Sequence, residues 1–198
     1  MTGAKMGKEQ PVTYYDDVFR GSAAYASDPH AAPWTHLWRE IAKSVGFDQH
    51  VFDLGCGPGH LAQMLAPMSL SYVGVDFSPV AIQQAKERCA HMSDVIFHVS
   101  DLRDAWLGDR ARPPVAQSMT VTVVVCCEVL EHISFDLEVL AAVPANTRVV
   151  FTVPNFDDAG HVRHFATVAE VVTRYQRALD HLNVRPIGSH YFCEGVAP

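Results

Sequence analysis

The stretch Val51-Phe-Asp-Leu-Gly-Cys-Gly-Pro-Gly-His60 decides the fold of this 198-residue chain. An apolar, β-prone run ends in three glycines at alternating positions, and a helix-prone stretch up to Leu65 follows directly. In the order strand, glycine turn, helix, the backbone can approach a nucleotide-like ligand closely because glycine carries no Cβ. The stretch therefore predicts the start of a nucleotide-binding α/β fold.

A second apolar run, Tyr72-Val-Gly-Val-Asp-Phe77, ends in an acid that lies 21 residues after Gly55. An acid about 20 residues after the first glycine is the expected position of a carboxylate that holds a ribose. We therefore expect Asp76 to accept hydrogen bonds from both ribose hydroxyls.

The glycine spacing and the acid before it differ from a dinucleotide fingerprint. In Asp53-Leu-Gly-Cys-Gly-Pro-Gly59 the glycines follow G-x-G-x-G, and an acid at Asp53 suits an amino group better than a phosphate. The stretch resembles the first motif of the class I S-adenosylmethionine (SAM) methyltransferases. Val75–Ile82, Val99–Leu102 and Cys127–Ile133 resemble further parts of the same family, and the similarity runs from about Trp34 to the C-terminus.

This resemblance implies SAM as the cofactor and S-adenosylhomocysteine as the product. Asp101 would meet the adenine amino group, Phe77 and Leu102 would cover the adenine faces, and Cys127 would offer backbone groups to the methionine portion. The full set of expected cofactor-binding residues is Asp53, Gly55, Cys56, Gly57, Gly59, Asp76, Phe77, Asp101, Leu102 and Cys127.

Strand-like and helix-like stretches alternate along the chain. Strands are expected over residues 51–54, 71–76, 94–99, 119–127, 147–153, 184–187 and 190–196, helices over 34–45, 60–66, 79–90, 128–143 and 167–182, and a loop over 103–118. This alternation predicts an α/β fold, a Rossmann-like three-layer sandwich of about seven mostly parallel strands. Right-handed crossovers place the ligand cleft at the carboxyl ends of the strands. The resemblance implies an antiparallel last strand.

We expect residues 34–198 to form one SAM-binding methyltransferase domain and residues 1–33 to form an N-terminal tail and candidate lid. Residues 11–33 are rich in aromatic side chains yet irregular in pattern. Similar methyltransferases use such a segment as a lid over cofactor and acceptor. The alternative is an extension that only packs its aromatic rings on the domain.

Charge, apolar runs and cysteine content indicate which kinds of binding partner and which cell compartment to expect. The formal net charge is −7 and basic residues form no run, whereas a nucleic-acid enzyme normally carries a positive stripe for phosphates. No apolar run reaches the ~18 residues that span a bilayer, and residues 1–10 lack the apolar region of a secretory signal. Five cysteines without zinc-type spacing indicate reduced thiols. We therefore predict a cytoplasmic enzyme with a small-molecule acceptor, no nucleic-acid partner and no membrane partner, and with no indication of oligomeric state.

Glu128, Glu131 and His132 follow the expected central strand directly. On a helix these positions, i, i+3 and i+4, share one face. The stretch resembles that of ubiquinone-pathway O-methyltransferases and small-RNA 2′-O-methyltransferases, in which a divalent metal is implicated. Three interpretations are open: an acid/base or orienting role, a metal site, or capping and packing. We favour the first, name Glu128 and His132 as catalytic candidates, and assign no metal ligand.

The stretches Val153–Asp157 and His161–His164 should complete the rim of the cleft. His164 is the third catalytic candidate, either as a base that faces the acceptor or as a cap at the start of a helix. Phe165–Glu170 departs from the longer basic segment of the small-RNA enzymes, which weakens the RNA hypothesis.

The leading prediction is a SAM-dependent methyltransferase that acts on an oxygen or nitrogen of a small molecule. The alternatives are a metal-assisted RNA 2′-O-methyltransferase, a SAM-using enzyme that catalyses cyclisation or alkyl transfer, and a SAM-binding regulatory module without catalysis. The binding motifs report the cofactor and leave the acceptor open.

Overall fold

The computed structural model describes residues 7–104 and 120–198. Its strands are β1 (His50–Leu54), β2 (Ser71–Asp76), β3 (Val95–Val99), β4 (Val123–Cys126), β5 (Arg148–Pro154), β6 (Asp180–Ile187) and β7 (His190–Val196). Its helices are α1 (Val12–Gly21), α2 (Ala23–Ala26), α3 (Thr35–Val45), α4 (His60–Leu65), the 3-10 helix η1 (Ala66–Met68), α5 (Pro79–Arg88), α7 (Asp136–Ala141) and α8 (Val168–Tyr175).

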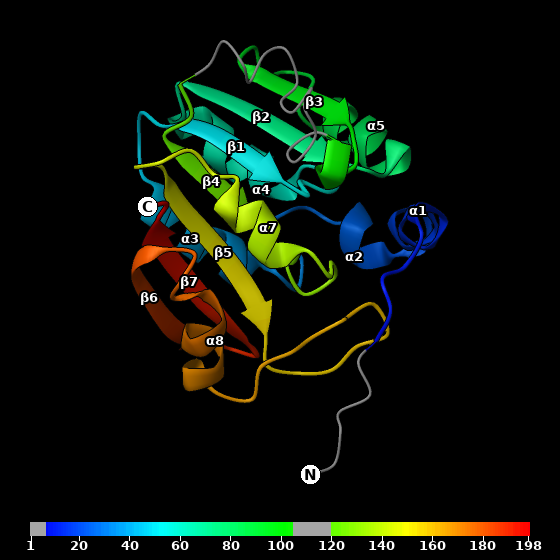
Figure 1. The fold of residues 1–198 in the computed structure, drawn as a ribbon. Coiled ribbons are helices and arrows are strands. Elements are labelled where there is room, and N and C mark those ends of the chain that lie inside the picture. Colours follow the sequence, from blue (N-terminus) through cyan, green and yellow to red (C-terminus); the bar gives the residue numbers. More distant parts are fainter. Residues whose placement is uncertain (1–6, 105–119) are drawn as a thin grey trace.

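The seven strands form one sheet in the order β3-β2-β1-β4-β5-β7-β6. β3, β2, β1, β4 and β5 pair in parallel, whereas β7 is antiparallel to both β5 and β6. Figure 1 shows the helices arranged around this twisted sheet. The predicted Rossmann-like α/β fold with an antiparallel last strand is confirmed. The order reverses between β1 and β4, which is where open α/β sheets bind their ligands.

Two apolar cores lie on opposite faces of the sheet. Phe52 of β1 joins Leu140 of α7 and Tyr175 of α8 in one core. Its neighbour Val51 joins Ile41 of α3, together with residues of α4 and α5, in the other. Successive residues of a strand point to opposite faces, so the apolar run of β1 is buried on both sides, as a central parallel strand requires.

The prediction of one helix over residues 128–143 is wrong, because only Asp136–Ala141 is helical. Glu128 has a φ of 58°, in the left-handed region, which a right-handed helix cannot contain. Residues 127–135 form turns instead. Glu128, Glu131 and His132 therefore do not share a helical face.

Residues 11–33 are more regular than expected, since they contain α1 and α2. Asp16 and Phe19, three residues apart on α1, are its buried residues, so the segment has a helical inner face. β4 is shorter than the strand expected over 119–127. Most of the loop expected over 103–118 lies outside the described residues. Within the described residues, no helix is long and apolar enough to cross a membrane.

Candidate active site

A cavity of about 670 Å³ lies at the carboxyl ends of β1, β2 and β4. Its wall is formed by the glycine loop after β1, by the residues that follow β2, β3 and β4, and by the N-terminal segment. In Figure 1 the helices α1 and α2 lie beyond these strand ends. The cavity is thus at the predicted place and is covered by residues that precede the sheet in sequence.

The glycine loop is shaped by its neighbours. A Cβ on Gly55 would lie 2.4 Å from a methyl group of Val129, and the φ of 74° at Gly55 is itself unfavourable for other residues. A Cβ on Gly59 would lie 3.0 Å from the Cβ of Ala85 on α5, so this glycine allows close packing of the loop against that helix. Gly57 places its N–H 3.0 Å from Asp76 Oδ2.

Asp76, at the end of β2, lines the cavity with both oxygens held in place. Oδ2 accepts from Gly57 N–H, and Oδ1 accepts from Ser78 N–H at 2.8 Å. Each oxygen keeps a further lone pair, so the carboxylate can still accept two hydroxyl donors. Burial raises the pKa of Asp76 to about 6, against the opposing effect of the two hydrogen bonds. The geometry suits a ribose diol.

Asp53, at the end of β1, also lines the cavity and is 2% exposed. One carboxylate oxygen accepts a hydrogen bond from the Tyr72 hydroxyl. The other oxygen, Oδ1, is buried without a hydrogen-bond partner in the described structure. Burial raises the pKa of Asp53 to about 7, although the Tyr72 bond lowers it. A buried oxygen without a partner suits an incoming ammonium group, such as that of the methionine portion of SAM.

Nine of the ten expected cofactor residues line this cavity. Asp101 is at its rim, where its carboxylate accepts from Arg103 N–H at 2.7 Å. Gly59 is the exception, because it packs against α5. The structure brings these residues together, and their individual contacts with SAM stay predictions.

Glu128 lines the cavity and is fixed from two strands. Its Oε1 accepts from the Thr152 hydroxyl of β5 at 3.0 Å, and its Oε2 lies 3.0 Å from His190 Nε2 of β7. The hydroxyl of Thr152 also accepts from Glu128 N–H at 3.0 Å, which fits the left-handed backbone at this residue. His190 is 3% exposed. The sequence did not single out Thr152 or His190, since both come from strands distant in sequence.

Glu131, His132 and His161 form a second cluster beside Glu128. One potential ligand atom of each lies within 4.8 Å of the others. Glu131 is fully buried, and neither of its carboxylate oxygens has a hydrogen-bond partner among the described residues. Burial, together with the neighbouring Glu128 carboxylate, raises the pKa of Glu131 well above its ordinary value. His132 and His161 line the cavity.

The structure separates His164 from this site. Its ring faces Asp157, with Nδ1 3.7 Å from Oδ1, and it borders a shallow hollow next to α8. His161, three residues earlier, takes the cavity position instead. The signal was present in the stretch His161-Val-Arg-His164, but loop geometry decided which histidine faces inward.

The N-terminal segment contacts the site directly. Tyr15 lies against both Phe77 and His132, with ring centroids 5.3 and 5.7 Å away. Asp16 accepts from the Ser78 hydroxyl at 2.5 Å, and Ser78 N–H in turn holds Asp76. Such contacts over the cavity are consistent with a lid, which stays a prediction.

Comparison with known proteins indicates the class of protein to which this site belongs. Residues 52–148 match a family model described as a methyltransferase domain. Over 162 residues the chain is 27% identical to the mitochondrial ubiquinone biosynthesis O-methyltransferase of Schizosaccharomyces pombe, with 80% of this chain and 53% of that protein covered. The chain therefore spans about half the length of the curated relative that it matches.

Two solved structures share the fold at lower identity. One is the complex between the Haloferax volcanii Trm112 methyltransferase activator and a methyltransferase, with a TM-score of 0.66 and 17% identity over 93% of this chain and 97% of that one. The other is the N-methyltransferase NodS from Bradyrhizobium japonicum with S-adenosylhomocysteine, with a TM-score of 0.59 and 16% identity over 91% and 90% of the two chains.

The match of residues 52–148 to a methyltransferase domain, the similarity to the ubiquinone-pathway enzyme and the shared fold support a class I SAM-dependent methyltransferase, a class whose cofactor is SAM. Its relatives within the class methylate different atoms. The matched yeast protein is an O-methyltransferase and NodS is an N-methyltransferase, by their names. Membership of the class therefore does not specify the acceptor.

Proposed function

We propose that the protein transfers a methyl group from SAM to an oxygen or nitrogen of a small-molecule acceptor. The observation that carries this proposal is the His132 ring, which lines the cavity with Nδ1 2.8 Å from the Gly160 carbonyl oxygen. A carbonyl only accepts, so Nδ1 carries the proton and Nε2 keeps a basic lone pair. Burial lowers the pKa of His132, which favours this neutral form at pH 7.

The charges around the cavity support a small acceptor that is not an anion. Arg103 is the one lysine or arginine among the described residues that line the cavity, and it is paired with Glu9 at 3.3 Å. Carboxylates dominate the remaining charged wall. A volume of about 670 Å³ must also hold the cofactor, which leaves room for an acceptor of modest size.

Each part of the reaction can be assigned to residues of this chain. SAM supplies, when bound, an electrophilic methyl group on a positively charged sulfur. Attack of the acceptor lone pair on this methyl carbon would leave the electron pair of the broken carbon–sulfur bond on sulfur, so the chain has only to align the two reactants and take up the acceptor proton. Alignment of the two reactants can supply on the order of 7–11 kcal/mol. We assign the acceptor proton to His132 Nε2 and the orientation of the acceptor to Glu128.

A second candidate, metal-assisted transfer to oxygen, is favoured by the cluster of Glu131, His132 and His161. Both histidines direct Nδ1 at a backbone carbonyl, that of Gly160 and that of Phe156 at 3.2 Å. This is the outer contact that metal-binding histidines usually make. The residues fit a divalent ion, because two imidazoles make a suitable ligand set together with the Glu131 carboxylate, whose oxygens have no hydrogen-bond partner among the described residues. A bound ion would favour the deprotonated form of an acceptor hydroxyl.

One experiment separates these functions. The protein is incubated with SAM and fractionated metabolite pools, and the products are followed by mass spectrometry. S-adenosylhomocysteine supports methyl transfer, whereas methylthioadenosine, or neither product, overturns it. With an active pool, His132→Ala is then compared with wild type, with and without EDTA.

The two candidates predict different patterns in that comparison. A base role predicts that EDTA leaves wild type active, while His132→Ala slows turnover by ~10²–10⁴ without weakening SAM binding. A metal role predicts equal losses from EDTA and from His132→Ala. His164→Ala serves as the matched control, since His164 lies outside the cavity. Full activity of folded His132→Ala would end the assignment of a catalytic role to His132.

A further inference from the structure

Two separate loop segments supply the rings of His132 and His161. Residues 130–133 belong to the turns after β4, and residues 160–163 belong to the loop between β5 and α8. Val162 N–H donates to the Glu131 carbonyl at 2.8 Å, and the His132 ring reaches Gly160 as described above. Side chains on loops need such support to keep a reactive geometry.

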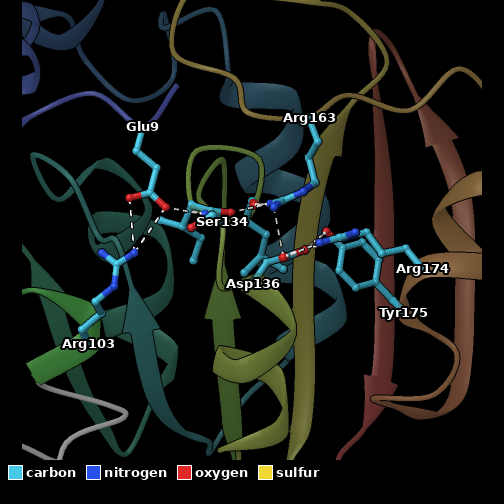
Figure 2. Close-up of polar contacts among 9 residues, drawn as sticks. Glu9, Arg103, Ser134, Asp136, Arg163, Arg174 and Tyr175 are labelled. Carbon is cyan, nitrogen blue, oxygen red and sulfur yellow. Dashed lines mark hydrogen bonds and ion pairs between the residues drawn. The ribbon is translucent and has the colours of Figure 1, made fainter. Parts of the chain in front are cut away.

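Arg163 closes the junction between the two segments. Its Nη1 donates to the carbonyls of Leu130 and Ile133, the latter at 2.6 Å. Its Nη2 lies 3.2 Å from Asp136 Oδ1, and the Arg163 side chain is only 10% exposed. Figure 2 shows Arg163 extending from its loop to the turn before α7 and to Asp136. One guanidinium thus holds both ends of the turn that carries Glu131 and His132.

The position of Arg163 is itself fixed. The fully buried Asp136 accepts two hydrogen bonds from Arg174, at 2.7 and 2.6 Å, and one from the Tyr175 hydroxyl at 2.9 Å. These partners belong to α8, and in Figure 2 they approach the carboxylate from the right, whereas Arg163 approaches it from above. Asp136 is therefore anchored independently of the turn. A planar guanidinium can bridge this anchor and two carbonyls at once, which an ammonium group cannot reproduce.

We infer that Arg163 is a positioning residue of the candidate active site: by clamping residues 130–133 to residues 160–163, it sets the relative placement of the His132 and His161 rings. The inference rests on the proposed function for the use of those rings. The placement itself can be measured without knowledge of the acceptor.

The test compares Arg163→Met and Arg163→Lys with the matched control Arg174→Met in the full chain. Arg174 shares Asp136 with Arg163, but among the described residues it makes no hydrogen bond to the 130–133 turn. Ring nitrogens of ¹⁵N-histidine-labelled protein report the tautomer of each histidine, and His132→Ala and His161→Ala spectra assign the signals. SAM affinity and melting temperature are recorded for every variant.

We expect wild type and Arg174→Met to show His132 as the single Nδ1-protonated tautomer, even though Arg174→Met melts at lower temperature. Arg163→Met should show mixed tautomers at His132 and shifted signals at His161, with SAM affinity changed less than threefold. Arg163→Lys should lie between the two, and it supplies the answer if Arg163→Met does not fold. An unchanged His132 signature in a folded Arg163 variant, or an equal disturbance in Arg174→Met, would overturn the inference.

Turnover measurements distinguish a failure of the Arg163 inference from a failure of the proposed role of His132. If Arg163 acts through His132, Arg163→Met should slow turnover, and the double variant Arg163→Met/His132→Ala should be no slower than His132→Ala. Full activity of His132→Ala would sink the proposed role of His132 and leave the tautomer result standing. Additive losses in the double variant would contradict action through His132.

Discussion

At the residue scale, two carboxylates face one cavity from neighbouring strands. Asp53 lies near the end of β1 with one oxygen lacking a partner among the described residues, and Asp76 ends β2 with both oxygens held by backbone N–H groups. Burial raises the pKa of both above the ordinary range for aspartate. The free protein therefore carries an electrostatic cost that a ligand with an ammonium group and two ribose hydroxyls would relieve.

Asp76→Ala should weaken SAM binding at least tenfold while the protein stays folded. The reason is that the variant removes the acceptor of both expected ribose bonds, each worth about 1.5–3 kcal/mol when the acceptor is charged. Calorimetric titration of SAM measures the affinity, and Asp94→Ala, at an exposed acid beside β3, serves as control. A folded Asp76→Ala protein with wild-type affinity would contradict the site assignment.

Asp53 should make the stability of the SAM-free protein fall as pH rises. Its folded-state pKa of about 7 lies above the ordinary aspartate value of 3.8, so the folded state binds the proton more tightly. This contribution is complete below the unfolded pKa and is lost as pH rises through 7, a change on the order of 2–4 kcal/mol. Asp53→Asn removes the titration.

Melting curves from pH 5 to pH 8 check this sign. The melting temperature of wild type should fall relative to Asp53→Asn over that range, and SAM should stabilise wild type more at pH 8 than at pH 5. Parallel curves for the two proteins would show that Asp53 does not titrate with a raised pKa.

At the scale of elements, the sequence predicted what periodicity and glycine patterns determine. β1, β2 and α5 follow from local apolar runs. The turns of residues 127–135 could not be predicted in this way. Two of their carbonyls accept hydrogen bonds from Arg163, some 30 residues later, and Glu128 is held by Thr152 and His190, which are 24 and 62 residues away in sequence. The same long-range contacts place His161 inside the cavity and His164 outside.

Helix α1 should support cofactor binding through Asp16. Its carboxylate, 9% exposed, bonds the hydroxyl of Ser78, the residue that caps α5 and holds Asp76. Asp16→Ala leaves that hydroxyl without its buried partner, a loss of about 1–3 kcal/mol. We expect lower stability together with a five- to tenfold weaker affinity for SAM.

The neighbouring Asp17 provides a close control for this prediction. Its side chain is 81% exposed and pairs with Arg20 of the same helix, at 3.2 Å. Exposed pairs of this kind contribute 0–1 kcal/mol at most sites, so Asp17→Ala should bind SAM as wild type does. Equal effects of the two substitutions, measured by calorimetry and thermal melting, would argue against a specific link from α1 to the cofactor site.

At the scale of the whole molecule, the site exists only where distant parts of the chain meet. The ends of β1 to β3 provide the expected cofactor residues other than Cys127, and the segments after β4 and β5 provide Cys127, Glu128, His132 and His161. The N-terminal segment covers both. Glu9 joins these parts, because it pairs with Arg103 after β3 and accepts from Ser134 N–H at 2.5 Å, as Figure 2 shows.

The net charge of −7 leads to the last prediction, that the protein does not bind generic RNA or DNA at ~150 mM salt. Binding without sequence preference depends on lysine and arginine that neutralise phosphates and release counterions. The described cavity wall offers one such side chain, Arg103, already paired with Glu9. Fluorescence anisotropy with labelled single-stranded and double-stranded RNA should show no binding up to the micromolar range, and lower salt should not produce tight binding. Submicromolar affinity at ~150 mM salt would overturn the small-acceptor proposal and favour RNA 2′-O-methylation, with the Glu131, His132 and His161 cluster as its metal site.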